Sequence, residues 1–523
     1  MLNDSFHVYD TTLRDGAQRE GITYSVEDKL AVAALLDDFG VGFIEGGWPG
    51  ALPKDTEFFA RMANGEVQLK NAKLVAFGST RKAGISADED PQVRALIDSQ
   101  APVITLVAKS DVWHVEQALK TTKEENLAMI ADTVSFIVDM GRRVFVDFEH
   151  FFDGYKHDPD YGVACVQAAI NAGADVAVLC DTNGGMLPSG IEFIVKEVIS
   201  RTGARVGIHC QDDTGCAIAN SIAAVEAGAT HVQCTANGYG ERTGNADLFS
   251  VVANIELKLN KKVLPEGSLQ EMVRVSHAIA EIANLTPDTH QPYVGVSSFA
   301  HKAGLHASAI KVSPELYNHI DAASVGNDMR VLVTEMAGRA SIELKGKELG
   351  YDLSNNKVAV EKVVDQVKNL EAQGWSFEAA DASFELLLQS AISGDVNQKF
   401  QVESWRVIVE QREDGLVVAE ATVKLHIDGE RVIATGEGNG PVNALDNALR
   451  TALLSKFPEI AKLDLVDYKV RILDGGQGTG SVTRVLIDTA NRGKRWTTVG
   501  VHENIIAASW LALEDAVQYG LLK

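Results

Sequence analysis

The stretch "RVGIHCQ" (Arg205–Gln211) is a short apolar run that ends in polar side chains, and seven similar runs occur in the first 265 residues. They are "FHVYD", "GFIEGG", "KLVAFGS", "PVITLVA", "VFVDFEH", "VAVLCDT" and "HVQCTAN", and a longer segment follows each one. Most of these segments have the apolar spacing of an amphipathic helix. Eight β-then-α units within about 250 residues predict a (β/α)₈ TIM barrel. An open doubly wound sheet has the same units, but no GxGxxG follows the first run, which favours the barrel.

The polar ends of these runs are the candidate functional residues. Strand alternation puts His209 and Gln211 on one face, so that they resemble two ligands aimed at one point. In a barrel, the carboxyl ends of all strands form one face on which distant residues converge. The other polar residues at or near such ends include Arg14, Asp15, Glu45, Glu149, Asp181 and Asn237.

The remainder of the chain predicts two further parts. Residues 266–394 are mostly helical in pattern, with an irregular stretch at Tyr293–Tyr317 that is either a connector or an arm reaching into a site. Residues 395–523 are β-rich and repeat a strand–strand–helix scheme, which predicts a pseudo-duplicated α+β domain. Its halves hold no obvious catalytic cluster, so we interpret it as a regulatory module.

Composition limits the partners. A net charge of −24 argues against nucleic acid or an anionic membrane as partner, so an anionic substrate needs a local positive centre. The five cysteines form no CxxC pair, which indicates reduced thiols. There is no basic apolar leader and no run of about 18 apolar residues, which predicts a soluble cytoplasmic protein.

Several motifs, taken together, resemble a known family. In order they are "YDTTLRDGAQ" (Tyr9–Gln18), "IEGGWPG", "DFEHFFDGYKHDP", "LCDTNGG", "GIHCQDDTG" and "NGYGERTGNADL" (Asn237–Leu248). They resemble the DRE-TIM metallolyases, the group that holds 2-isopropylmalate synthase, homocitrate synthase and citramalate synthase. The C-terminal part resembles their LeuA-type allosteric domain. "GSTRKA", "ANLTPDTHQPYVG", "FAHKAGLH", "GNGPVNALDNALR" and "TVGVHENII" are most similar to the long bacterial citramalate synthase type.

The resemblance implies roles for individual residues. Arg14 would polarise the keto oxygen of a 2-oxo acid, Glu149 would complete the Asp–Arg–Glu set, and Thr182 would hold the substrate carboxylate. His306 would assist proton removal across a dimer interface, with Tyr317 close by. The implied ligands of a divalent metal ion are Asp15, His209, Gln211 and Asn245.

Gln211 is a departure from the family, whose seventh strand carries His-x-His. An amide oxygen in place of an imidazole nitrogen favours Mg²⁺ or Mn²⁺, with Zn²⁺ possible. The opposite interpretation is a site that holds no ion, with Gln211 merely hydrogen-bonded at the strand end.

The implied activity is an acyltransferase reaction in which acetyl-CoA condenses with pyruvate and the thioester is hydrolysed, giving citramalate for isoleucine biosynthesis. The chain would be a homodimer, with isoleucine as effector. The nearest rival is the same chemistry on 2-oxoisovalerate, which is 2-isopropylmalate synthesis in the leucine pathway. A lyase or carboxyltransferase would be a second class of function, and a non-catalytic effector-binding relative would be a third.

Overall fold

The computed structural model describes residues 4–334, 338–353, 356–393, 398–473 and 480–523. The chain forms two compact units. The first comprises Met1–Phe299 with Asp321–Asp328, and the second comprises Ala300–Ile320 with Met329–Lys523. Each unit has buried hydrophobic clusters of its own.

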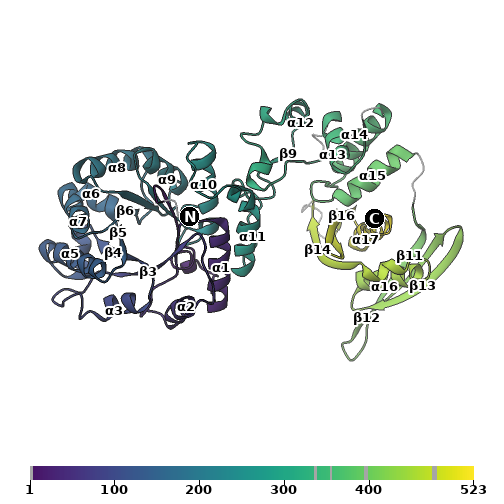
Figure 1. The fold of residues 1–523 in the computed structure, drawn as a ribbon. Helices are drawn as coiled ribbons and strands as arrows, with labels where there is room; N and C mark the ends of the chain where they lie inside the picture. The colour runs from purple at the N-terminus through teal and green to yellow at the C-terminus, as the bar shows by residue number, and fades with distance from the viewer. Residues whose placement is uncertain (1–3, 335–337, 354–355, 394–397, 474–479) are drawn as a thin grey trace. The chain divides into compact units, whose positions relative to one another are not determined.

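The first unit is a closed barrel of eight parallel strands, which confirms the predicted fold (Figure 1). Each strand pairs with its neighbours in sequence, and the pairing of β1 with β8 closes the ring. Each of the eight apolar runs contains one strand. The strands are β1 (His7–Asp10), β2 (Phe43–Glu45), β3 (Lys73–Ser79), β4 (Val103–Lys109), β5 (Arg143–Glu149), β6 (Val176–Asp181), β7 (Val206–Cys210) and β8 (His231–Cys234).

Helices surround the barrel. In α1, Ser25 caps the helix start by accepting from the Asp28 N–H, and the Asp28 side chain accepts from the Ser25 N–H in return. Gly40 ends α1 in the left-handed region. The helices of this unit are α1 (Val26–Phe39), α2 (Pro53–Ala63), α3 (Pro91–Asp98), α4 (Val112–His114), α5 (Lys123–Asp139), α6 (Phe151–His157), α7 (Pro159–Asn171), α8 (Pro188–Thr202), α9 (Ala217–Glu226), α10 (Leu248–Leu257) and α11 (Met272–Ile282).

A buried cluster of side chains fills the inside of the barrel. Bulky side chains from six of the strands meet there, so this part of the interior is a packed core rather than a pore. Polar side chains at the carboxyl ends of the strands line a cavity instead. The core residues are Tyr9, Phe43, Val75, Val103, Phe145, Val176, Val178 and Cys180.

The second unit begins with short elements and three longer helices. The short strands β9 (Ala300–His301) and β10 (Arg330–Val331) pair in parallel, and α12 (Gly304–Ile310) follows β9. The helices α13 (Arg339–Glu348), α14 (Lys357–Ala372) and α15 (Asp381–Ser393) share one hydrophobic core with the C-terminal strands. In that core, Phe384 of α15 is packed in the same cluster as Val499 and Val501.

Two similar halves form the end of the chain, as the sequence predicts. Each half has three antiparallel strands and a helix, one strand more than the strand–strand–helix scheme. Both helices pack on their own sheet and contribute to a common core (Figure 1). The halves are β11 (Gln401–Gln411), β12 (Val417–Ile427), β13 (Glu430–Gly438) and α16 (Pro441–Leu453), then β14 (Asp464–Ile472), β15 (Thr483–Asn491), β16 (Lys494–His502) and α17 (Ile505–Leu522).

Two glycines, Gly436 and Gly500, have equivalent positions in the two halves. A Cβ on Gly436 would lie 2.3 Å from the backbone N of Ala448, and a Cβ on Gly500 would lie 2.8 Å from the backbone N of Ala512. Each glycine therefore lets the helix of its own half lie directly on the strand. In both halves the contact joins the last strand to the helix that follows it.

Helix α17 is long and apolar enough to cross a membrane by length and composition alone. More than half of it is buried inside the protein, however. Leu513 and Val517 belong to the core between the two halves. The helix is therefore part of the core of its unit.

Candidate active site

Arg14 is held rigidly in the loop above β1. Its Nε donates to Oε2 of Glu45 at the end of β2 (2.6 Å), and its guanidinium carbon lies 3.9 Å from the centre of the Phe77 ring. Glu45 is fully buried and also accepts from the hydroxyls of Tyr9 and Thr11, the latter at 2.6 Å. The direction of the guanidinium is thus set by a carboxylate that is itself fixed on several sides.

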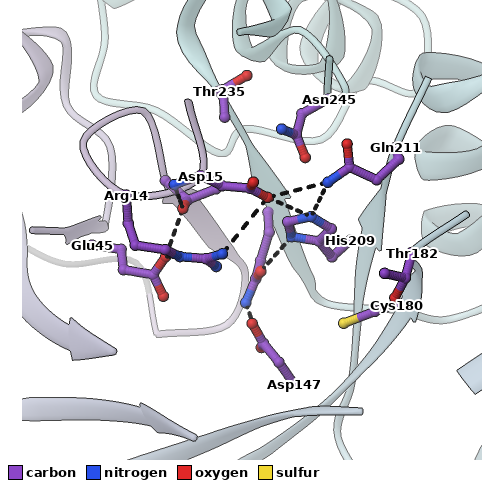
Figure 2. A network of polar contacts seen from close by, with 12 residues as sticks. Arg14, Asp15, Glu45, Asp147, Cys180, Thr182, His209, Gln211, Thr235 and Asn245 are labelled. Carbon is purple, nitrogen blue, oxygen red and sulfur yellow. Dashed lines mark hydrogen bonds and ion pairs between the residues drawn. The ribbon is translucent and has the colours of Figure 1, made fainter. Parts of the chain in front are cut away.

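Asp15, His209 and Gln211 lie together at the carboxyl ends of β1 and β7. The Nε2 atom of His209 is 3.1 Å from Oδ2 of Asp15, and Nε2 of Gln211 donates to the same oxygen at 3.2 Å. Figure 2 shows the three side chains pointing toward one another. Two residues 196 positions apart in sequence, Asp15 and Gln211, meet here as the barrel closes.

Asn245 joins this group through the chain that follows β8. Gln211 and Asn245 form an isolated bridge, and the Asn245 amide donates to the carbonyl of Tyr239 at 2.9 Å. Gly240 makes room for it, because a Cβ there would lie 2.2 Å from Nδ2 of Asn245, at a φ of +151°. Among the described residues, neither Oε1 of Gln211 nor Oδ1 of Asn245 has a hydrogen-bond partner, although both atoms are buried.

Asp15 and His209 are buried side by side, so the charge of each shifts the pKa of the other. For Asp15, burial raises the pKa, but the charges of Arg14 and His209 outweigh it and hold the pKa well below the usual range. For His209, burial lowers the pKa, and the Asp15 carboxylate more than reverses this, so that the pKa is raised. The two shifts therefore favour opposite charges on the two side chains, with Asp15 ionised and His209 protonated.

A cavity of about 440 Å³ opens beside these residues. Thr182, after β6, lines it and accepts from the backbone N–H of His150 at 2.8 Å. Glu149 also lines the cavity, but its carboxylate pairs with Lys109, its register neighbour on β4, and not with Arg14. The described site thus brings together Arg14, Asp15, Glu149, Thr182, His209, Gln211 and Asn245.

His306 and Tyr317 lie in the second unit. His306 is in the first turn of α12, and its ring stacks on that of Tyr317 with centroids 4.1 Å apart. His301 is near, at 6.2 Å between ring centroids, and its Nε2 lies 2.7 Å from Oδ1 of Asn318. The two predicted residues are therefore neighbours within their own unit.

Comparison with protein families identifies the barrel. The family described as HMGL-like matches residues 5–279, which is more than half of the chain. This chain belongs to the HMGL-like family. The homocitrate synthase post-HMGL domain-like family matches residues 293–374, and the LeuA allosteric (dimerisation) domain matches residues 378–521.

Curated relatives of this HMGL-like protein match it over its full length. It is 68% identical to the (R)-citramalate synthase of Streptomyces coelicolor, over 100% of this chain and 98% of the relative. It is 47% identical to the (R)-citramalate synthase of Aquifex aeolicus, over 100% and 99%. Identity to the 2-isopropylmalate synthase of Methanocaldococcus jannaschii is 29%, over 100% and 96%. The chain is an acyl-CoA-condensing transferase of the citramalate synthase type.

The HMGL-like family generally depends on a divalent metal ion, and the residues present fit one. No group of three or more His, Cys, Asp or Glu side chains in metal-binding arrangement occurs in the described part of the chain. The available donors are instead one carboxylate, one imidazole nitrogen and the unpartnered amide oxygens of Gln211 and Asn245. Carboxylate and amide oxygens suit hard cations.

Sequence reasoning missed three contacts in this HMGL-like site. The sequence did not show that Glu45 binds Arg14. It also did not single out Gln233, which contacts His209, or Asp147, which contacts Gln233. Alternation offered a signal, because Asp147 and Glu149 share a face of β5, as do His231 and Gln233 on β8. The pairing of partners depends on the register between strands, which the sequence does not state.

Proposed function

We propose that the barrel condenses acetyl-CoA with pyruvate and hydrolyses the thioester, so that acetyl-CoA, pyruvate and water give (R)-citramalate and CoA. One observation carries the proposal. At the mouth of the barrel, a fixed arginine stands beside an Asp–His pair and two unpartnered amide oxygens. The full-length likeness to (R)-citramalate synthases supports pyruvate as the oxo acid.

The positive centre in the cavity would bind the anionic oxo acid. In a chain with a net charge of −24, Arg14 and a bound cation are what would hold it there. We assign to Arg14 the keto oxygen, where negative charge develops as the new carbon–carbon bond forms. Thr182, on the same cavity wall, would donate its hydroxyl to the substrate carboxylate. Glu149 remains a cavity-lining carboxylate paired with Lys109, and we assign the part of Arg14's partner to Glu45.

Asp15, His209, Gln211 and Asn245 would hold the divalent ion. When bound, the ion would act as a Lewis acid on the oxo acid. Mg²⁺ or Mn²⁺ is favoured over Zn²⁺, because three of the four donors are oxygens. In the structure the Gln211 amide nitrogen faces Asp15, and exchanging the two amide atoms would turn Oε1 to that side.

His306 is the proposed general base. The methyl group of acetyl-CoA is a weak carbon acid, and imidazole titrates near working pH. Tyr317, stacked against His306, would fix the plane of its ring. We further propose that the chain works as a cytoplasmic homodimer, which the match to the LeuA dimerisation domain supports.

The C-terminal domain would sense an end product, and we propose isoleucine, the product of the pathway that citramalate feeds. A cavity of about 580 Å³ lies at the start of α16. Leu463 and Leu465 give it an apolar wall. Asp446 and Arg450, paired at 2.9 Å, supply one charge of each sign for an amino-acid zwitterion.

The test is turnover by the purified full chain after treatment with a chelator. Release of the CoA thiol is followed with pyruvate or 2-oxoisovalerate, in the presence of Mg²⁺, Mn²⁺ or Zn²⁺, and the product is identified by mass spectrometry. We expect citramalate from pyruvate, with a much lower rate on 2-oxoisovalerate. Faster turnover of 2-oxoisovalerate would assign the chain to 2-isopropylmalate synthesis, and no turnover of either would make it a non-catalytic relative.

A further inference from the structure

His209 has a second polar contact on the side away from Asp15. Its Nδ1 atom lies 2.8 Å from Oε1 of Gln233, and Nε2 of Gln233 donates to Oδ1 of Asp147 at 2.8 Å. All three side chains are buried. They come from β7, β8 and β5, and His209 and Gln233 are register partners on adjacent strands. Figure 2 shows Asp147 and Asp15 on opposite sides of the His209 ring.

The hydrogen bonds that join His209, Gln233 and Asp147 all run in one direction, with each donor on the side of His209. Nε2 of Gln233 donates to Oδ1 of Asp147, so the NH₂ group of the amide is on the side of that carboxyl group. The amide oxygen then faces His209, and an oxygen that only accepts requires a hydrogen on Nδ1. The neutral form of the ring that would bind an ion then has its hydrogen on Nδ1 and its lone pair on Nε2, which is the atom that faces Asp15.

We infer that Gln233 is a positioning residue that fixes the tautomer of His209, so that Nε2 is available to a divalent ion, and that Asp147 sets the direction of the Gln233 amide. This inference rests on the ion site proposed at Asp15 and His209. A residue behind a metal-binding histidine commonly orients the ring and raises its basicity, and its loss costs about 10–100-fold in metal affinity.

Two variants with the same net charge as the natural chain separate positioning from packing. Gln233→Leu keeps the approximate volume of the side chain but removes both hydrogen bonds. In the double variant Gln233→Glu with Asp147→Asn, the carboxylate is at position 233 and the amide at position 147. The carboxylate then accepts from His209 Nδ1 and from the new amide, so the contact to His209 keeps its direction.

The experiment measures Mn²⁺ affinity of the full chain by chelator competition, with no substrate present. We expect Gln233→Leu to weaken Mn²⁺ binding by about 10–100-fold, and the double variant to bind within about threefold of the natural chain. Gln167→Leu, at a half-buried position of α7 whose amide bonds only Asn171 among the described side chains, is the control and should bind normally. Melting temperatures establish that each variant is folded.

The inference is overturned if folded Gln233→Leu binds Mn²⁺ as well as the natural chain, or if the double variant binds no better than Gln233→Leu. Should Gln233→Leu not fold, the affinity of the double variant decides, and a loss of 10-fold or more overturns the inference. Because the readout is binding, a chain that shows these differences but makes no citramalate would contradict the proposed function alone. A chain that makes citramalate while Gln233→Leu binds Mn²⁺ normally would contradict this inference alone.

Discussion

Glu45 holds Arg14: Oε2 of the buried carboxylate accepts from Nε of the guanidinium at 2.6 Å. The same oxygen accepts from Thr11, and Oε1 accepts from Tyr9. The arginine is thus oriented before any substrate arrives, and a group fixed in advance does not have to reorganise during the reaction. Its positive charge is also reinforced, because Glu45 and Asp15 outweigh the effect of burial and raise the pKa of Arg14.

Arg14→Lys tests whether this orientation matters. Lysine keeps the charge but loses the planar fork that bonds Glu45 and stacks on Phe77. We expect kcat to fall by about 100-fold or more, with a smaller change in KM for pyruvate. Steady-state kinetics with pyruvate varied gives both values. Arg61→Lys, at a half-buried arginine that pairs with Glu66 on the outside of the barrel, is the control, and full activity of Arg14→Lys would remove Arg14 from the mechanism.

Gln211→His tests the metal preference. The change restores the His-x-His spacing and replaces an amide oxygen by an imidazole nitrogen, which Zn²⁺ favours. We expect chelator-treated natural protein to regain activity with Mg²⁺ or Mn²⁺, and the ratio of Zn²⁺ to Mn²⁺ affinity to rise by about 10-fold or more in the variant. Undiminished turnover in the stripped natural protein, with no metal detectable, would contradict the metal site.

His306→Gln tests the proposed base. We expect kcat to fall by about 10²–10⁴-fold, as when a general base is removed, with the affinity for pyruvate little changed. Isothermal calorimetry with pyruvate and a CoA-release assay separate binding from turnover. The exposed His290→Gln serves for comparison. Equal turnover by the two variants would exclude His306 as the base.

Asp446→Asn tests the proposed effector cavity. If the carboxylate of Asp446 accepts the ammonium group of isoleucine, its loss should raise the inhibition constant by about 10-fold, as expected when one hydrogen bond between charged groups is lost. Turnover without isoleucine should stay the same. Glu459→Gln changes a charge on the nearby surface and is the control. The effector proposal fails if isoleucine neither binds nor inhibits the natural chain.

Asp515 makes the stability of the second unit depend on pH. Burial raises its pKa to about 7, although the hydroxyl of Ser383, 2.6 Å away, opposes this. An ordinary Asp has a pKa of about 3.9. The folded state therefore holds the proton more tightly, so the contribution of Asp515 to stability is greatest below about pH 4 and falls as pH rises toward 7.

Asp515→Asn removes this dependence. We expect the variant to gain melting temperature relative to the natural chain by a few degrees between pH 5 and pH 8, measured by calorimetry. The exposed Asp464→Asn should show no such trend. A difference that does not change with pH would mean that Asp515 ionises as it does in the unfolded chain.

The barrel could be predicted because its signal is repeated and local. Eight apolar runs at regular spacing leave few folds open, and each run contains a strand. The cluster at the mouth could be predicted in part for the same reason. Arg14, Asp15, His209 and Gln211 stand at or just beyond strand ends, which in a closed parallel barrel must lie on one face.

The partners within the site could not be predicted, because they depend on strand register and side-chain reach. Glu45 and Glu149 both end strands, yet Glu149 is opposite Lys109 in the β4–β5 register while Glu45 faces the loop that carries Arg14. Gln233 is a similar case. It lies inside an apolar run, and its contact with His209 can be inferred only once the register between β7 and β8 is known.

Because β1 pairs with β8, the candidate ion site can form only after β8 has been translated. Asp15 is made early in synthesis, whereas His209, Gln211 and Asn245 leave the ribosome about 200 residues later, and at 5–20 residues per second this delay is about 10–40 s. Until β7 emerges, Asp15 is the only one of the four candidate ligands in the nascent chain. The candidate ion site is therefore complete only after Asn245, which follows the last strand, has been translated.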